Sequence, residues 1–146
     1  MRDLDLIPGF HFRVEFLGQG FPENDSRFQS VSGLEVSIDT EAVREGGENR
    51  FEYALPTKTS YSSLSLKRGV MHDSGVIDWI KETITSLQIK PLDILVTLLD
   101  EEHQALMEWN IKHAWPRKWS VSEFNAMNNE LVVETLELQY SYFTQK

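Results

Sequence analysis

Three short clusters contain residue types that could catalyse a reaction or bind a metal or a nucleotide. The first resembles a serine-hydrolase triad. His72-Asp73-Ser74 contains the three residue types of that triad at adjacent positions. A triad is a spatial arrangement that neighbouring residues cannot form together, and the chain has no Gly-x-Ser-x-Gly turn to expose a nucleophile. A turn that begins a helix is the better interpretation of this cluster.

The other two clusters could bind a metal or a nucleotide. Glu101-Glu102-His103 offers oxygen and nitrogen ligands but lacks the HExxH spacing, so a solvated turn is predicted. Gly18-Gln19-Gly20 begins like a dinucleotide-binding loop, but Glu23 occupies the final glycine position and no helix follows. We therefore expect no catalytic residue, no metal site and no cofactor.

Aromatic residues could form a stacking platform for bases or sugars; these are Trp109, Trp115, Trp119, Tyr140 and Tyr142. The net charge of −9, with 23 acidic and 14 basic residues, argues against a nucleic-acid binder, which would show a basic face. Packing in the core or at a subunit interface is therefore favoured for the aromatic residues, and the same holds for His113.

The length of 146 residues fits one domain, residues 1–146. The chain has no cysteine, and hence no disulfide framework. The charged start Met1–Asp5 is unlike a signal peptide, and no apolar run is long enough for a membrane anchor. These features predict a protein made and folded in the cytoplasm.

Alternation of apolar and polar residues predicts about six strands, over Phe10–Phe16, Phe28–Asp39, Ser63–Arg68, Leu92–Leu99, Ala105–Trp115 and Leu131–Phe143. Gly33 suggests a bend in the second strand, and the fourth and fifth strands form a hairpin. Pro116-Arg117-Lys118 is expected to end the fifth strand, and Ser122–Ala126 to form one helical turn.

Two of these strands have a predicted division into two faces. The fifth should place one set of residues on one side: Met107, Trp109, Ile111, His113 and Trp115. The last should alternate through Leu136, Leu138, Tyr140 and Tyr142 on one side and Glu137, Gln139 and Ser141 on the other, with a change of phase near Glu134.

One helix is predicted over residues 74–88, with Asp73 or Ser74 as its cap. Its apolar stripe is expected to contain Val76, Ile77, Ile80, Ile84 and Leu87. Asp78, Lys81 and Glu82 should face outward, and Trp79 lies off the stripe. The fold class is therefore mainly antiparallel β, sandwich- or barrel-like, with one flanking helix, and its sheet edges must close within the chain or across copies.

Residues 41–61 are predicted to form a long loop. Gly46-Gly47 permits unusual backbone angles, and Pro56 removes a hydrogen-bond donor. Loops of this length in compact domains are usually functional or disordered. Because this one carries Phe51, Tyr53, Leu55 and Tyr61, we expect it to pack on another surface, of which a neighbouring copy is one candidate.

Four segments resemble one family. They are the stretch Arg44–Val70, the segment Gly69-Val70-Met71 before the helix, the run Trp109–Pro116 (WNIKHAWP) and the run Phe124–Leu131 (FNAMNNEL). They are similar to the inner-tube proteins of contractile phage tails and related contractile injection systems, and the resemblance extends from about Phe28 onward.

The resemblance implies hexameric rings that stack into a tube, with strands of every copy forming a shared β-barrel around a lumen for DNA or effector passage. It implies three kinds of partner: the sheath protein, baseplate or spike proteins, and terminator proteins. The expected location is a phage tail or a phage-tail-like particle, which a cell could release. The resemblance also gives roles to particular residues. The inter-ring contact would use Arg44, Glu45, Gly46, Gly47, Glu48, Arg50 and Lys58. The helix face toward the sheath would carry Asp78, Lys81 and Glu82. The lumen wall would include Glu35, Ser37, Glu137, Gln139 and Ser141.

Three alternatives stay open at this point. One is a tube-initiator paralogue at the junction of baseplate and tube. Another is a small monomeric β-barrel that binds an apolar ligand in its interior. The third is an enzyme, for which the sequence shows no convergent set of titratable residues.

Overall fold

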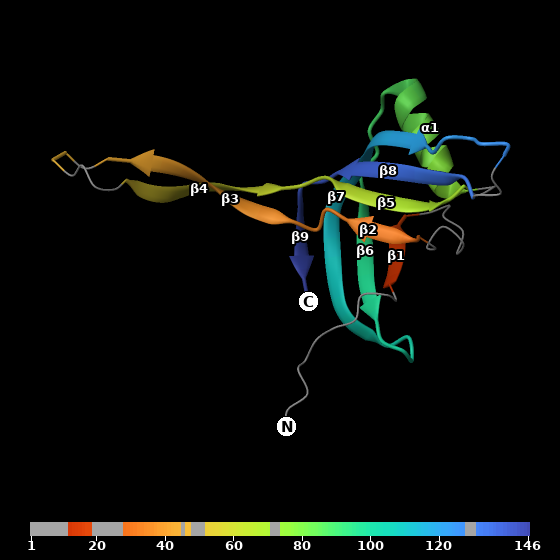
Figure 1. Ribbon diagram of the computed structural model, residues 1–146, viewed down its shortest axis with the longest axis horizontal. Helices are drawn as coiled ribbons and strands as arrows, with labels where there is room; N and C mark the ends of the chain where they lie inside the picture. The colour runs from red at the N-terminus through yellow and green to blue at the C-terminus, as the bar shows by residue number, and fades with distance from the viewer. Residues whose placement is uncertain (1–11, 19–27, 45, 48–51, 71–73, 128–130) are drawn as a thin grey trace.

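The computed structural model describes residues 12–18, 28–44, 46–47, 52–70, 74–127 and 131–146 (Figure 1). In this part of the chain, nine strands and one helix form a body from which a two-stranded arm projects. The elements are β1 (Phe12–Leu17), β2 (Ser30–Ser32), β3 (Val36–Val43), β4 (Tyr53–Tyr61), β5 (Leu64–Gly69), α1 (Gly75–Ser86), β6 (Leu92–Leu99), β7 (Ala105–Val121), β8 (Val133–Gln139) and β9 (Tyr142–Gln145).

The prediction of a mainly antiparallel β fold with one helix is confirmed, but about six strands was too few. The run 28–39 is divided between β2 and β3, the predicted loop 41–61 contains β4, and the run 131–143 is divided between β8 and β9. The start of the first predicted strand, Phe10 and His11, lies outside the described residues.

The strands of the body follow the order β1-β6-β7-β8-β5-β2, with β9 paired to β7, and every pairing is antiparallel. The first part of β7 pairs with β6 and β9, whereas its last part, from Trp115, pairs with β8. The sheet therefore turns along β7, so that β1 and β6 run across the direction of β5 and β8 (Figure 1). We call β1, β6, β9 and residues 105–114 the first layer, and β2, β5, β8 and residues 115–121 the second layer.

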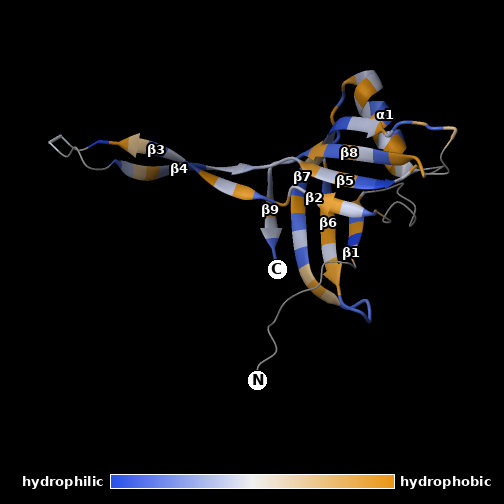
Figure 2. Ribbon diagram, in the orientation of Figure 1, coloured by the Kyte–Doolittle hydropathy of each residue, from blue (hydrophilic) through white to orange (hydrophobic). Residues whose placement is uncertain are grey.

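The core lies between these layers. Along β5 and β8 apolar residues alternate with polar ones (Figure 2), and the apolar residues are the buried ones. Fully buried apolar side chains come from both layers: Val14, Ile94 and Ile111 from the first, and Leu64, Leu66 and Leu138 from the second. Burial of apolar area of this kind is the main favourable contribution to folding.

The expected break at Pro116 is wrong, because β7, which is 17 residues long, continues through this residue to Val121. Two irregularities allow this. At the first, β6 and β7 shift register and His113 has a φ of 56°. At the second, between Pro116 and Lys118, the missing proline N–H falls where the ladder is already interrupted.

The first irregularity also reverses the buried face of β7. Ile111 is buried, but the next buried residue is Ala114, so His113 is exposed instead of sharing the face of Ile111. The Asp93 carboxylate accepts hydrogen bonds from the His113 backbone N–H at 3.1 Å and from Lys112 Nζ at 3.3 Å. The backbone hydrogen bond is the largest of the effects that lower the pKa of Asp93, and the Lys112 charge adds to it. Burial acts in the opposite direction but does not cancel these effects.

Helix α1 begins where the sequence predicts. The Ser74 hydroxyl accepts a hydrogen bond from the Ile77 N–H at 3.3 Å, and Leu87 ends the helix in the left-handed conformation. The buried face differs from the predicted stripe: it comprises Val76, Trp79, Ile80 and Thr83, whereas Ile84 and Leu87 are exposed.

Trp79 explains the difference between the two apolar faces. Its ring packs edge-on against Phe16, with the ring centres 6.1 Å apart, and its Nε1 donates to the Lys90 carbonyl at 2.9 Å. Both faces have helical spacing, and the one with the indole buries the larger apolar area.

A buried ion pair joins the second layer to the start of the helix. Arg68 Nε of β5 lies 2.6 Å from Glu134 Oε1 of β8, and the guanidinium also donates to the Ser74 hydroxyl at 2.6 Å. Trp119 Nε1 donates to the other Glu134 oxygen at 3.0 Å. Glu134 is therefore part of the buried row of β8, and the predicted change of phase near this residue is wrong.

Candidate interaction surfaces

The predicted loop 41–61 is, in its described part, a β-hairpin. β3 and β4 pair from Val36 opposite Tyr61 to Val43 opposite Tyr53 and form a separate two-stranded sheet, which we call the arm. Figure 1 shows the arm extending far from the body. Pro56 is tolerated in β4 because both strands of a two-stranded sheet are edge strands.

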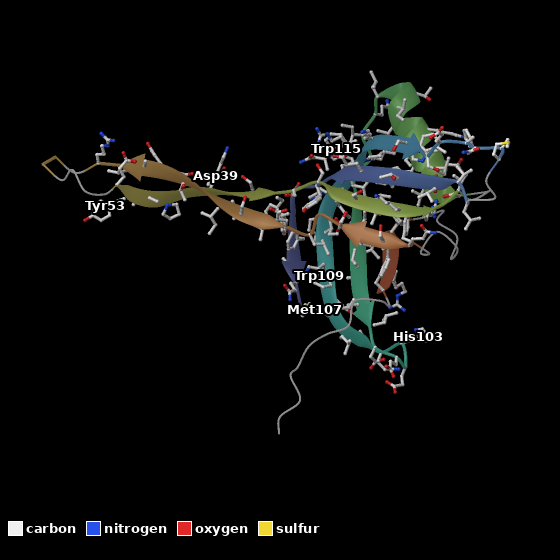
Figure 3. The ribbon with its side chains drawn as sticks, viewed as in Figure 1. Asp39, Tyr53, His103, Met107, Trp109 and Trp115 are labelled. Atoms are coloured by element: carbon white, nitrogen blue, oxygen red, sulfur yellow. The ribbon has the colours of Figure 1, made fainter. Side chains whose placement is uncertain are left out.

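Side chains hold the arm together at its one register shift, between Ile38 and Thr40. Asp39 accepts a hydrogen bond from Ser60 Oγ on its carboxylate at 2.9 Å and from Thr57 Oγ1 on its carbonyl at 3.1 Å. Figure 3 shows Asp39 midway along the arm. The arm also exposes four aliphatic side chains, which we call the arm patch: Val36, Ile38, Val43 and Leu55. Because an isolated hairpin is marginally stable in water, this element fits a surface that is covered on assembly.

Four of the predicted inter-ring residues lie on the arm. Arg44 forms an ion pair with Glu52, Gly46 and Gly47 form the turn at the tip, and Lys58 is exposed in β4. Glu45, Glu48 and Arg50 lie outside the described residues.

The root of the arm is tightly built around Gly33. This residue has a φ of 93°, and a Cβ at this position would lie 2.0 Å from the Ser63 carbonyl oxygen. Only glycine fits such a backbone approach. Gly33 therefore sets the direction in which the chain leaves β2 for the arm, which confirms the predicted bend.

Aromatic rings support the same root. Tyr61, the last residue of β4, packs edge-on against Tyr140 and Phe143, with ring centres 5.9 and 5.1 Å apart. The Tyr140 hydroxyl donates to the Gly33 carbonyl at 3.5 Å. Burial, followed by the nearby Tyr61 and Glu35 groups, raises the pKa of Tyr140 to about 12.

The outward face of the second layer is polar. Glu137 and Gln139, two predicted lumen residues, lie on it with Ser65, which is opposite Glu137. Arg117 Nη1 lies 3.4 Å from Glu137 Oε1 and donates to Ser63 Oγ at 3.1 Å. Ser63 Oγ in turn donates to Gln139 Oε1 at 3.3 Å.

The other predicted lumen residues are not on this face. Glu35 is at the arm root, Ser37 is on the arm, and Ser141 follows β8; all three are exposed. The sequence analysis missed Ser65 and Arg117. The alternation of β5 could have identified Ser65, but Arg117 required knowledge that β7 continues past Pro116.

The exposed face of α1 carries the three predicted sheath-facing residues, Asp78, Lys81 and Glu82. Glu82 Oε1 forms an ion pair with Lys90 Nζ at 2.6 Å. Ile84 and Leu87 are also exposed, so this surface mixes charged and apolar groups.

A further apolar surface lies between β7 and β8. Phe124, Met127 and Leu131, which we call the end patch, are 75%, 92% and 78% exposed. Phe124 and Leu131 help to line a hollow of about 380 Å³, formed by residues 122–126 and 131–132, and Met127 follows directly after it in the chain. The predicted helical turn at 122–126 is wrong: Ser122 bonds through its backbone and hydroxyl to Val133, and the turn lies at Ala126–Met127.

A second hollow, of about 290 Å³, lies at the open side of the sheet. Its lining includes Phe12, Val31, Leu34, Leu98 and Trp109. Within the described residues, β1 and β2 end the strand order without pairing to each other, so this part of the chain does not form a closed barrel.

The aromatic residues considered for a stacking platform are dispersed. Figure 3 shows Trp109 and Trp115 well apart along β7. Trp119 donates to the buried Glu134, and Tyr140 is buried at the arm root. The arrangement therefore serves packing and not stacking of a ligand.

The polar clusters have structural roles where they are described. Ser74 caps α1, while His72 and Asp73 lie outside the described residues, as do Gln19 and Gly20. Asp100 Oδ1 accepts from the Glu102 and Gln104 N–H groups and shapes the exposed turn before β7. In the part of the chain that the structure describes, no three His, Cys, Asp or Glu residues lie close enough to hold a metal ion. Its helix, moreover, is too short and too polar to cross a bilayer.

The chain is similar to several known proteins. The family model described as T4-like virus tail tube protein gp19 matches residues 8–144. No curated protein sequence matches the chain significantly.

Several solved structures are similar over nearly the whole chain. A chain of the anti-feeding prophage baseplate is 28% identical, with a TM-score of 0.88, and the match covers 100% of this chain and 97% of that one. A chain of the sheath-tube complex of the extracellular contractile injection system PVC is also 28% identical, with a TM-score of 0.82 and coverages of 97% and 92%. Hcp1 from Flavobacterium johnsoniae, at 12% identity, a TM-score of 0.60 and coverages of 92% and 93%, shares the fold.

Proposed function

The chain belongs to the T4-like virus tail tube protein family, and we propose that its copies form hexameric rings that stack into the inner tube of a contractile injection system. The observation that supports stacking is the arm, whose aliphatic side chains have no core of their own chain to enter. In a tube of identical subunits, a neighbouring copy provides that surface. The comparisons favour a tube subunit over a tube initiator or a ligand-binding barrel.

The faces of the body divide between the inside and the outside of such a tube. We assign the polar face of the second layer, with Glu137 and Gln139, to the lumen wall, because a passage must stay hydrated and release its cargo. Ser141, Ser37 and Glu35 are exposed near the arm root and are candidates for the lumen edge. An acidic chain, with a net charge of −9, would repel a polyanionic cargo and so limit its adhesion to the wall.

The exposed face of α1 is assigned to the outside, where Asp78, Lys81 and Glu82 would meet sheath subunits. Similar chains come from a sheath-tube complex, a baseplate and a tube-terminating cap. Proteins of these three kinds are the partners proposed here, with assembly in the bacterial cytoplasm and DNA or an effector as cargo. The role is structural, and no catalysis is expected.

Electron microscopy of the concentrated, purified chain tests this function. Rings and tubes are expected from the native sequence. Replacing residues 44–50 with a short Gly/Ser turn should leave the circular dichroism of the domain and ring formation intact but prevent stacking. Two results would count against the proposal: a chain that stays monomeric at every concentration, or normal tubes from the shortened variant.

A further inference from the structure

We propose that the end patch, Phe124, Met127 and Leu131, with the hollow that it borders, is the surface that receives the arm of a second copy. This inference rests on the proposed function, because it concerns the contact between one ring and the next. It assigns an occupant to a surface that the sequence analysis did not identify.

The two surfaces lie at opposite ends of the molecule. Figure 1 shows the arm at one end of the longest axis and the segment that joins β7 to β8 at the other. A contact between different patches at opposite ends repeats from copy to copy without reversing direction, which is the geometry of a stack. Within one copy the arm cannot reach the end patch.

Both surfaces also expose apolar side chains to water. The arm patch, Val36, Ile38, Val43 and Leu55, is exposed on a hairpin that is too small to form a core. The end patch is the more exposed of the two and borders a hollow of about 380 Å³. Contact between them would remove both apolar surfaces from water.

Charge favours the same pairing. Glu123 contributes the charged side chain to the described lining of the end hollow. Near the arm tip, the side chain of Arg44 is 79% exposed even though it pairs with Glu52. Opposite charges at the rim of an apolar contact fix its register and exclude wrong arrangements.

The other apolar surfaces fit the arm less well. The hollow of about 290 Å³ is lined by Val31 and Leu34, which directly precede β3, so it lies at the root of the arm and not at the opposite end. Ile84 and Leu87 are exposed on α1, the face assigned to the sheath.

Disulfide trapping tests the contact directly, because the native chain has no cysteine. The variant L55C/A126C, assembled into tubes and mildly oxidised, should give a ladder of covalent multimers on a non-reducing gel. L55C and A126C alone should not, and neither should L55C/L87C, in which the second cysteine is on the exposed face of α1. The pairs L55C/F124C and L55C/L131C extend the test across the end patch.

The alternatives give distinct results. Tubes that form normally while L55C/A126C, L55C/F124C and L55C/L131C all stay uncoupled would overturn the inference and leave the proposed function standing. Coupling of L55C to V31C instead would place the arm in the other hollow. A native chain that forms neither rings nor tubes would remove the proposed function itself, and this inference with it.

Substitution of the patch gives an independent measure. F124S/M127S should raise the protein concentration needed for tube formation at least about tenfold, as expected when burial of large apolar side chains is lost. Rings and the unfolding midpoint should be unchanged. The control I84S/L87S, which replaces two apolar side chains that are exposed on α1, should stack normally. Normal stacking by F124S/M127S would contradict the inference.

Discussion

The body and the arm use the same residue types in opposite ways. Both contain an arginine–glutamate ion pair, but Arg68 and Glu134 of the body are 2% and 4% exposed, whereas Arg44 and Glu52 of the arm are 79% and 43% exposed. Both contain alternating strands, but the apolar side chains of β5 are buried and those of β3 are exposed.

This difference separates two kinds of stability. The body completes its own core between two layers of sheet, so its residues determine whether one chain folds. The arm buries almost nothing within the chain, so we expect its residues to determine whether chains associate. Substitutions in the two regions should therefore be detected by different measurements.

The largest expected effect is in the buried ion pair. R68M leaves the Glu134 carboxylate buried without its cation and should lower the free energy of unfolding by about 3–5 kcal/mol in urea denaturation. The double variant R68M/E134L should regain most of that loss, because no charge remains buried. R44M, in the exposed pair of the arm, should change stability by less than about 1 kcal/mol. Equal losses from R68M and R44M would remove the distinction between body and arm.

The next effect is at the arm root. G33A forces a side chain into a left-handed backbone position and against the Ser63 carbonyl. It should therefore lower the free energy of unfolding by about 1–3 kcal/mol or more and displace the arm. G46A at the arm tip, where an added Cβ meets nothing within 4 Å, is the matched control and should be nearly neutral. Thermal unfolding of both variants measures the difference; a stable G33A would show that the root does not fix the arm.

A smaller effect is confined to alkaline pH. The pKa of Tyr140 is raised from 10.0 to about 12 in the folded chain, so the fold keeps this phenol protonated where the unfolded chain loses the proton. The stability that it contributes is complete below pH 10 and is lost as the pH rises toward 12. Denaturation at stepped alkaline pH should therefore show a decline that is weaker in Y140F. An identical decline in both proteins would contradict the burial of this hydroxyl at the arm root.

The smallest effect on the isolated chain is expected in the arm patch. I38S should change the unfolding free energy by less than about 0.5 kcal/mol, since the side chain is exposed in the single chain. The same variant should reduce tube formation in a sedimentation assay. The body variant L66S, in contrast, should unfold the chain before assembly can be measured. Strong destabilisation of the monomer by I38S would show that the arm packs on its own body.

Local patterns predicted much of the body. The strand Leu92–Leu99 has the predicted bounds, and the Ser74 cap and the Gly33 bend are where the sequence places them. These features depend on residues near in sequence: alternation, a capping hydroxyl, and a glycine that permits a positive φ. The outward position of Asp78, Lys81 and Glu82 follows from helical spacing alone.

The predictions from the sequence were wrong where the structure depends on a contact with a residue far away in the sequence. Glu134 is buried because Arg68, 66 residues earlier, neutralises it, and no pattern around Glu134 indicates this. β7 passes Pro116 because it changes partner from β6 to β8 near that residue. Trp79 is buried and Ile84 exposed because Phe16 lies on the tryptophan side of the helix.

The sequence by itself determined the class of the fold, the family resemblance and the alternation of apolar and polar residues along the strands of the body, because these are properties of composition and of neighbouring residues. Only the tertiary structure decided that β3 and β4 form a projecting hairpin and that an apolar end patch lies at the opposite end of the molecule. The physical reason is that strand pairing and burial depend on contacts between residues far apart in the chain, and no local sequence pattern indicates those contacts.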